Sequence, residues 1–270
     1  MAALQGLRGL DRQSAPRVHI LVMHHVFPDE RENFRTLLQS LSRRYRFISY
    51  GQAVERILAG QVDDEYLTLS FDDGLKCCVD AAEIMQEFGA TGCFFVCPPL
   101  IGETNSAAIG RFCQERLRLP PVQFMTWDDV ERLRNHGHEI GGHTMGHVDL
   151  GRVPVSQAMH EIGRSYDQLL RRVGEAKHFA WPYGRFHHIC PEAASHVFDV
   201  GYISCASAER GAHAGGPSVA PRQVCLRRDT IEARWPLSHI QYFLGRSACN
   251  ALQSKDTWPA EWHPNGRAAA

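Results

Sequence analysis

The chain has 270 residues, of which 44% are apolar and 22% are charged, and its formal net charge is −1. This composition is typical of a globular protein, and the length suits one large α/β domain. A nearly neutral chain gives no reason to expect a nucleic-acid or anionic-membrane partner. The basic pairs are scattered, and we expect them on solvated surfaces: Arg43-Arg44, Arg171-Arg172 and Arg227-Arg228.

No segment predicts export or membrane insertion. Residues 1–17 are small and polar with basic interruptions, and the apolar run at 19–23 is too short for a signal sequence or a bilayer span. The nine cysteines lack the spacing of a disulfide framework, which predicts free thiols in a reducing compartment. We therefore expect a cytoplasmic protein without a transmembrane segment.

Short apolar runs alternate with segments of helical spacing along most of the chain. The runs predict strands at 18–23, 66–71, 92–97, 138–143, 178–182, 201–206 and 223–228. The helical segments predict helices at 32–45, 50–60, 77–90, 126–137 and 156–174. Capping residues support these helices, because Thr126 and Asp129 form a capping-box pattern and Gly60 follows a helix end. Ser156 is the expected start of the last helix.

Repeated strand–helix alternation predicts a parallel sheet whose faces are covered by helices. We expect a barrel-like α/β fold in a single domain at 18–250, with an N-terminal extension at 1–17 and a C-terminal tail at 251–270. Residues 100–121 have the pattern of an insertion with one helix, and residues 209–222 that of a Gly/Pro loop.

The carboxyl ends of parallel strands carry the functional groups in such folds. The second strand leads into "SFDDG", so Asp72 and Asp73 emerge at this end. Adjacent residues leaving an extended strand point to opposite sides, so one carboxylate could face an ion and the other a bound water. The alternative is an ordinary Asp-Gly turn.

The fourth strand ends in "HTMGH", which places His143 and His147 four residues apart. With Asp73 these two imidazoles would form a three-ligand site with open positions, the arrangement of a catalytic metal. Zinc is the expected divalent ion for this ligand set, with cobalt, nickel and iron as alternatives. The histidines could otherwise be surface or core residues, since the chain has 15 of them.

The turn "AWPYG" follows the fifth strand, and we assign Trp181, Pro182 and Tyr183 to substrate or oxyanion contact. A tight turn there could aim the Tyr183 N–H into a cleft. The first strand ends in "MHHV", where His24 and His25 alternate in direction. One of them could face the same rim and act as a general acid near neutral pH.

These segments, in this order, resemble the motifs of the polysaccharide deacetylase family, the NodB-homology domain. "SFDDG" is similar to the first motif, "HTMGH" to the second and "AWPYG" to the third, and the resemblance spans about 18–244. It implies a distorted (β/α)7 barrel and removal of acetyl from an N-acetylated amino sugar, less often from an O-acetyl ester. It also implies that Asp72 is the catalytic base and that Asp73, His143 and His147 bind the metal.

Two departures from the family pattern concern the residues around the base. The third motif of the family often begins with an arginine that holds the base, whereas this chain has Ala180 there. The final Leu-x-His motif could be matched only by "LSH" at 237–239, which opens an apparent helix. A branch of the family has its acid histidine early in the chain, so we assign the acid role to His24 rather than His239.

The expected substrate is an N-acetylated amino sugar, an oligosaccharide, or a lipid- or nucleotide-linked sugar. Two other hypotheses stay open at this stage. One is a metal hydrolase of the same fold that acts on another amide or a cyclic imide. The other is a non-catalytic carbohydrate-binding relative, which the intact Asp72-Asp73 and His143-His147 pairs oppose. The sequence does not predict an oligomeric state.

Overall fold

The structure is a computed structural model that describes residues 15–253 and 257–262. Its strands are β1 (Arg17–Met23), β2 (Arg46–Phe47), β3 (Glu65–Phe71), β4 (Gly92–Val96), β5 (Glu139–Gly142), β6 (His178–Ala180), β7 (Ser204–Ala206), β8 (His213–Ala214), β9 (Cys225–Leu226) and β10 (Asp229–Thr230). Its α-helices are α2 (Arg31–Leu41), α3 (Tyr50–Ala59), α4 (Cys77–Gln86), α5 (Ser106–Phe112), α6 (Trp127–Asn135), α7 (Val155–Val173), α8 (Pro191–Asp199) and α9 (Leu237–Cys249). No helix among the described residues is long and apolar enough to cross a bilayer.

The strands form one curled sheet in the order β10-β1-β3-β4-β5-β6-β7-β9, and every pairing along this path is parallel. The two ends of the path are consecutive in the chain. Cys225 and Leu226 pair with β7, and three residues later Asp229 and Thr230 pair with β1. One extended segment therefore bridges both edges, which confirms the expected distorted barrel of seven strand positions.

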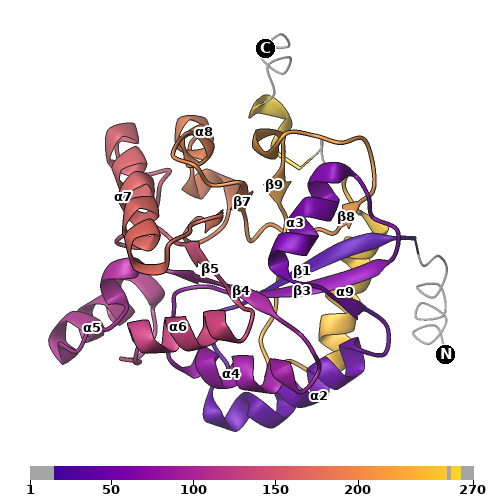
Figure 1. The fold of residues 1–270 in the computed structure, drawn as a ribbon, viewed down its shortest axis with the longest axis horizontal. Helices are drawn as coiled ribbons and strands as arrows, with labels where there is room; N and C mark the ends of the chain where they lie inside the picture. The colour runs from indigo at the N-terminus through magenta and orange to yellow at the C-terminus, as the bar shows by residue number, and fades with distance from the viewer. Residues whose placement is uncertain (1–14, 254–256, 263–270) are drawn as a thin grey trace.

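The alternation of side chains along each strand divides the core in two. The inner cluster includes Val18 and Ile20 of β1, Tyr66 of β3 and Leu226 of β9, all on alternate positions that point into the barrel. The larger outer cluster lies between the sheet and the surrounding helices, which Figure 1 shows around its periphery. Residues that continue the inward alternation beyond the last core residue therefore face the barrel interior.

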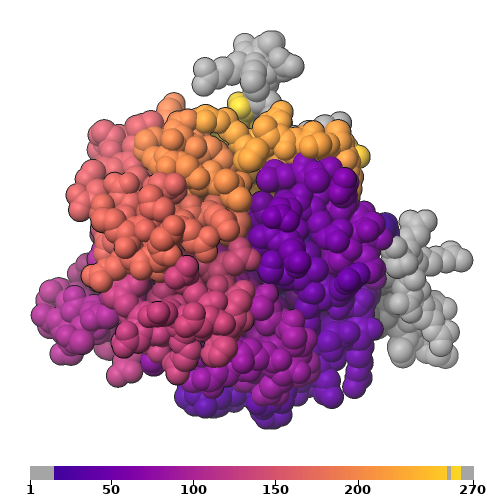
Figure 2. All heavy atoms as spheres, viewed as in Figure 1, coloured from indigo at the N-terminus to yellow at the C-terminus, as the bar shows by residue number. Residues whose placement is uncertain are grey.

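Helix α3 differs from the other helices because its apolar face belongs to the inner cluster, through Tyr50, Ala53, Val54 and Ile57. It lies in front of β1 and β3 in Figure 1. Its carboxyl end contacts the segment before β9, since the N–H groups of Gly216 and Val219 donate to the carbonyls of Gly60 and Leu58. Figure 2 shows the same meeting of the purple and orange segments on this face. Early and late parts of the chain thus cover one end of the barrel together.

Most predicted elements are present with shorter bounds, and two details of the prediction are wrong. Helix α7 begins after Pro154, so Ser156 lies inside its first turn and does not cap it. The pair Arg227-Arg228 is not solvated, because Arg228 is completely buried and Arg227 is partly so. The capping box of Thr126 and Asp129 is confirmed, and so is the left-handed Gly60 at the end of α3.

The predicted C-terminal tail is packed against the barrel where the structure describes it. The backbone of Leu252 exchanges hydrogen bonds with Ala212 and Ala214, at 2.9 Å each. Trp258 is only 9% exposed and stacks on Trp181, with ring centroids 6.2 Å apart. Most of the predicted N-terminal extension, residues 1–14, lies outside the described residues, and β1 begins at Arg17.

Candidate metal centre and active site

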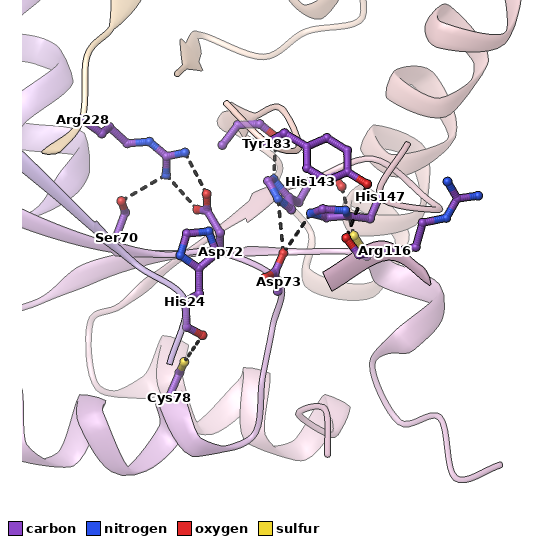
Figure 3. A network of polar contacts seen from close by, with 12 residues as sticks. His24, Ser70, Asp72, Asp73, Cys78, Arg116, His143, His147, Tyr183 and Arg228 are labelled. Carbon is purple, nitrogen blue, oxygen red and sulfur yellow. Dashed lines mark hydrogen bonds and ion pairs between the residues drawn. The ribbon is translucent and has the colours of Figure 1, made fainter. Parts of the chain in front are cut away.

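The motif segments that follow β1, β3 and β5 meet at one end of the barrel, as Figure 3 shows. His24 and Asp72 continue the inward alternation of their strands, so both side chains face the interior. Asp73 has a φ of 74°, and this left-handed conformation turns the chain out of the strand direction. The two adjacent carboxylates consequently point to different sides, as the sequence predicted.

Asp73, His143 and His147 form the one group of three potential metal ligands found among the described residues. One ligand atom from each lies within 4.8 Å of the others, and all three residues are buried. The Nε2 atoms of His143 and His147 lie 3.5 and 3.1 Å from the same carboxylate oxygen, Oδ1 of Asp73. Three candidate ligand atoms from two distant segments of the chain therefore lie close enough together to share one ion.

The chemistry of these three side chains fits a divalent cation. The Nδ1 atom of His143 lies 2.8 Å from the carbonyl oxygen of Ala180, and donating its proton there leaves the Nε2 lone pair directed at Asp73. Oδ1 of Asp73 is buried and has no hydrogen-bond partner of good geometry in the described part of the chain. Burial opposes ionisation of Asp73, but the two imidazoles hold its pKa well below the ordinary value. A carboxylate oxygen and two imidazole nitrogens match the ligand preferences of zinc and similar ions.

The second carboxylate, Asp72, forms a buried ion pair with Arg228. The two terminal nitrogens of Arg228 donate to the two oxygens of Asp72 at 2.8 Å each, so the pair is bidentate. Burial raises the pKa of Asp72. The charge and hydrogen bonds of Arg228 and the neighbouring His143 and His24 together outweigh burial, so this pKa is lowered. Asp72 is therefore an ionised acceptor next to the candidate metal ligands.

Arg228 is the residue that sequence reasoning missed. It lies in the segment that bridges β9 and β10, and its Nε donates to the carbonyl of Ser207 at 2.7 Å. A terminal nitrogen also reaches Ser70 Oγ at 3.2 Å. Ala180 stands where the family resemblance expects an arginine, and Arg228 instead presents a guanidinium to Asp72 from the segment between β9 and β10. The alternation Val224, Leu226, Arg228 was the available sequence signal, because it continues an inward-facing apolar pattern.

The three candidate acid histidines lie in different surroundings. His24 faces Asp72 across the barrel mouth, and its carbonyl accepts a hydrogen bond from the Cys78 thiol at 3.3 Å. His25 is turned away, with Nδ1 3.1 Å from Glu30 and its ring stacked on Phe27. His239 is exposed on α9, and its ring packs against two aromatic side chains of the helix region, Trp235 and Phe243. Only His24 is next to the candidate base.

The turn after β6 lies beside the candidate metal ligands. Tyr183 has a φ of 62°, and its ring centroid is 4.8 Å from that of His147. Pro182 precedes it in the turn and is buried. The Trp181 side chain is completely buried and donates from Nε1 to the carbonyl of Arg185 at 3.0 Å, so it supports the turn from inside the protein.

Backbone strain is concentrated in the motif segments. Among the described residues, five non-glycine residues have a positive φ, and four of them are Asp73, Thr144, His147 and Tyr183. Such conformations cost about 1–3 kcal/mol each and persist where the surrounding structure enforces them. Their clustering around the candidate metal centre is typical of a functional site.

The predicted insertion forms one wall of this site. After α5 the chain continues in a π-helical turn at Cys113–Leu117. The ring centroids of Phe112 and His147 are 6.2 Å apart, and the Tyr183 hydroxyl donates to the carbonyl of Arg116 at 3.4 Å. Segments that follow β3, β4, β5 and β6 thus converge on the same centre.

A family profile described as Polysaccharide deacetylase matches residues 59–197, which is 139 of 270 residues. The chain belongs to the polysaccharide deacetylase family. This family, the NodB-homology family, is one of hydrolases, and its match includes Asp72, Asp73, His143, His147 and Tyr183. His24 and Arg228 lie outside the matched range, so their places in the site come from the tertiary structure.

Solved deacetylase structures share the fold of this family member. IcaB from Ammonifex degensii has 20% identity and a TM-score of 0.65, covering 87% of this chain and 98% of its own. A de-N-acetylase from Aggregatibacter actinomycetemcomitans has 18% identity and a TM-score of 0.65, with coverages of 84% and 99%. The Streptococcus pyogenes deacetylase PplD, in complex with acetate, has 17% identity and a TM-score of 0.64, with coverages of 85% and 99%. The expected fold class is confirmed.

Proposed function

We propose that this protein is a divalent-metal-dependent deacetylase that hydrolyses the N-acetyl group of an amino sugar or glycan and releases acetate. The observation that carries the proposal is the pairing of two carboxylates with different surroundings. Asp73 faces two imidazoles, whereas the preceding residue, Asp72, is held by a buried arginine. Membership in the polysaccharide deacetylase family supports the reaction type.

The metal, which we propose to be zinc, would be held by Asp73, His143 and His147. When bound it would supply a Lewis acid that polarises the acetamide carbonyl and acidifies water. Asp72, ionised and fixed by Arg228, accepts the proton of the attacking water at a carboxylate oxygen. The rigid bidentate contact keeps this oxygen in place throughout the reaction.

Two further groups act on the substrate in this proposal. The Tyr183 backbone N–H donates to the carbonyl oxygen as negative charge develops on it, and the left-handed turn fixes its direction. His24 donates a proton to the departing sugar nitrogen from the interior side of the mouth. Pro182 and Trp181 hold the turn that presents Tyr183. The products are acetate and a free amine.

The decisive experiment separates metal binding from the role of the base. We expect Asp72→Asn to bind zinc like the wild type and to release acetate at least about a thousandfold more slowly, which corresponds to about 4 kcal/mol of barrier. Asp73→Asn, the matched change at the neighbouring residue, should lose metal affinity as well as turnover. Acetate release from a panel of N-acetylated amino sugars, nucleotide sugars and oligosaccharides is the activity measurement.

Other outcomes would point to other functions. Full turnover in Asp72→Asn would show that Asp72 is not the catalytic base, and the proposed mechanism would then be wrong. Zinc binding without acetate release from any acetamido sugar, but with hydrolysis of a cyclic imide, would favour a different amide substrate. Glycan binding without any hydrolysis would favour a non-catalytic relative.

A further inference from the structure

The loop that carries both histidine ligands contacts a carboxylate from a distant helix. Glu161 lies on α7, in its second turn, and is partly buried. Its Oε2 accepts hydrogen bonds from two consecutive backbone N–H groups, those of Met145 and Gly146, at 2.9 and 2.8 Å. These two residues directly precede His147, the second histidine ligand.

This loop has a conformation that needs support. Thr144 has a φ of 63° and His147 a φ of 49°, so the chain is left-handed on both sides of the contacts with Glu161. Each such non-glycine residue costs about 1–3 kcal/mol unless the surroundings enforce it. A carboxylate that accepts two N–H groups forms charge-assisted hydrogen bonds, which are about twice as strong as neutral ones.

The two histidine ligands are held in different ways. His143 is fixed at three points: its N–H donates to Val96, its carbonyl accepts from the Cys97 thiol, and its ring nitrogen lies 2.8 Å from the Ala180 oxygen. The ring Nδ1 of His147 is buried and has no hydrogen-bond partner among the described residues. Ring packing against Tyr183 and the course of the backbone therefore orient His147 so that its Nε2 faces Asp73.

We propose that Glu161 is a positioning residue for the metal centre, which holds the loop so that His147 reaches the ion. This inference rests on the proposed metal site and goes beyond it, since Glu161 touches neither the ligands' rings nor the reacting atoms. It acts through the backbone of Met145 and Gly146, so its removal changes the place of one ligand and leaves the other ligands unchanged.

The test measures zinc affinity of the metal-free full-length protein by calorimetric titration, together with its thermal unfolding. We expect Glu161→Ala to bind zinc about 10–100-fold more weakly, the usual effect of losing a group that orients a ligand. Glu161→Gln keeps the shape and one neutral acceptor, so we expect a loss of about threefold to tenfold. Asp167→Asn is the matched control, because it removes an exposed carboxylate from the same helix.

Each result decides the matter in one direction. Zinc affinities of Glu161→Ala and Glu161→Gln within twofold of the wild type would overturn the proposal, also if their unfolding temperatures fall. If the alanine variant does not fold, the isosteric glutamine variant decides alone by the same criterion. A loss as large in Asp167→Asn would equally overturn it, because the effect would then be one of helix charge. A wild-type protein that binds no zinc would instead refute the metal-dependent function itself.

Discussion

Replacing Arg228 by methionine removes the positive partner of Asp72 and leaves a side chain of similar length in its place. Arg228 is completely buried and the Asp72 side chain is 5% exposed, so water cannot take over the lost contacts. The variant would leave the Asp72 carboxylate in a low-dielectric interior without the guanidinium charge that pairs with it. It also removes the donor to the Ser207 carbonyl.

Breaking one side of a buried ion pair costs about 3–5 kcal/mol, a large part of the stability of an ordinary domain. We therefore expect the free energy of unfolding of Arg228→Met to fall by this amount. Arg228→Lys retains the charge but not the two parallel hydrogen bonds, so it should lose less. Turnover in both variants should fall about 100-fold or more, because the base is no longer fixed in its productive position.

Urea unfolding at neutral pH measures the stability, and acetate release measures the turnover. A double-mutant cycle with Asp72→Asn isolates the pair, since the double variant contains neither buried charge. We expect it to be at least about 2 kcal/mol more stable than the sum of the single losses predicts. A loss below about 1 kcal/mol in Arg228→Met, or strictly additive effects, would refute the reasoning about the buried pair.

The remaining predictions concern histidines. Burial lowers the pKa of His138 and of His213 to about 4, so the unfolded chain binds protons before the folded one does as pH falls below about 6.5. These neutral rings make their full contribution to the free energy of unfolding above about pH 6.5. By pH 5 this free energy has fallen by about 2 kcal/mol per ring. Urea unfolding at pH 7 and at pH 5 measures how far the free energy of unfolding falls between these two values. This fall should be smaller in the double variant with glutamine at both positions than in the wild type, and an equal fall would contradict the prediction. His24→Ala should abolish most acetate release while His239→Ala leaves it unchanged, and the reverse pattern would show that the acid is on α9.

His24 and Arg228 show which residues of the site a local sequence pattern can predict and which it cannot. Both residues face the barrel interior because they continue an inward alternation, and this period of two is a local property of an extended chain. For the first strand the alternation left His24 and His25 open, and the resemblance to a family branch with an early acid histidine selected His24, which does face the interior. For Arg228 the same alternation was present, but a buried arginine requires a partner, and the partner is 156 residues away in the chain. The charge pattern alone favoured the solvated surface.

The sequence by itself predicted the strand and helix order, the convergence of "SFDDG" and "HTMGH" at strand ends, and the candidate ligand set Asp73, His143 and His147. These features follow from local periodicity and from the rule that parallel strands end on one side of a sheet. Only the tertiary structure decided which arginine pairs with Asp72 and that Trp258 of the tail packs behind the Tyr183 turn. Contacts of this kind depend on the closure of the barrel, which brings its last strand segment against its first, and no local pattern specifies them.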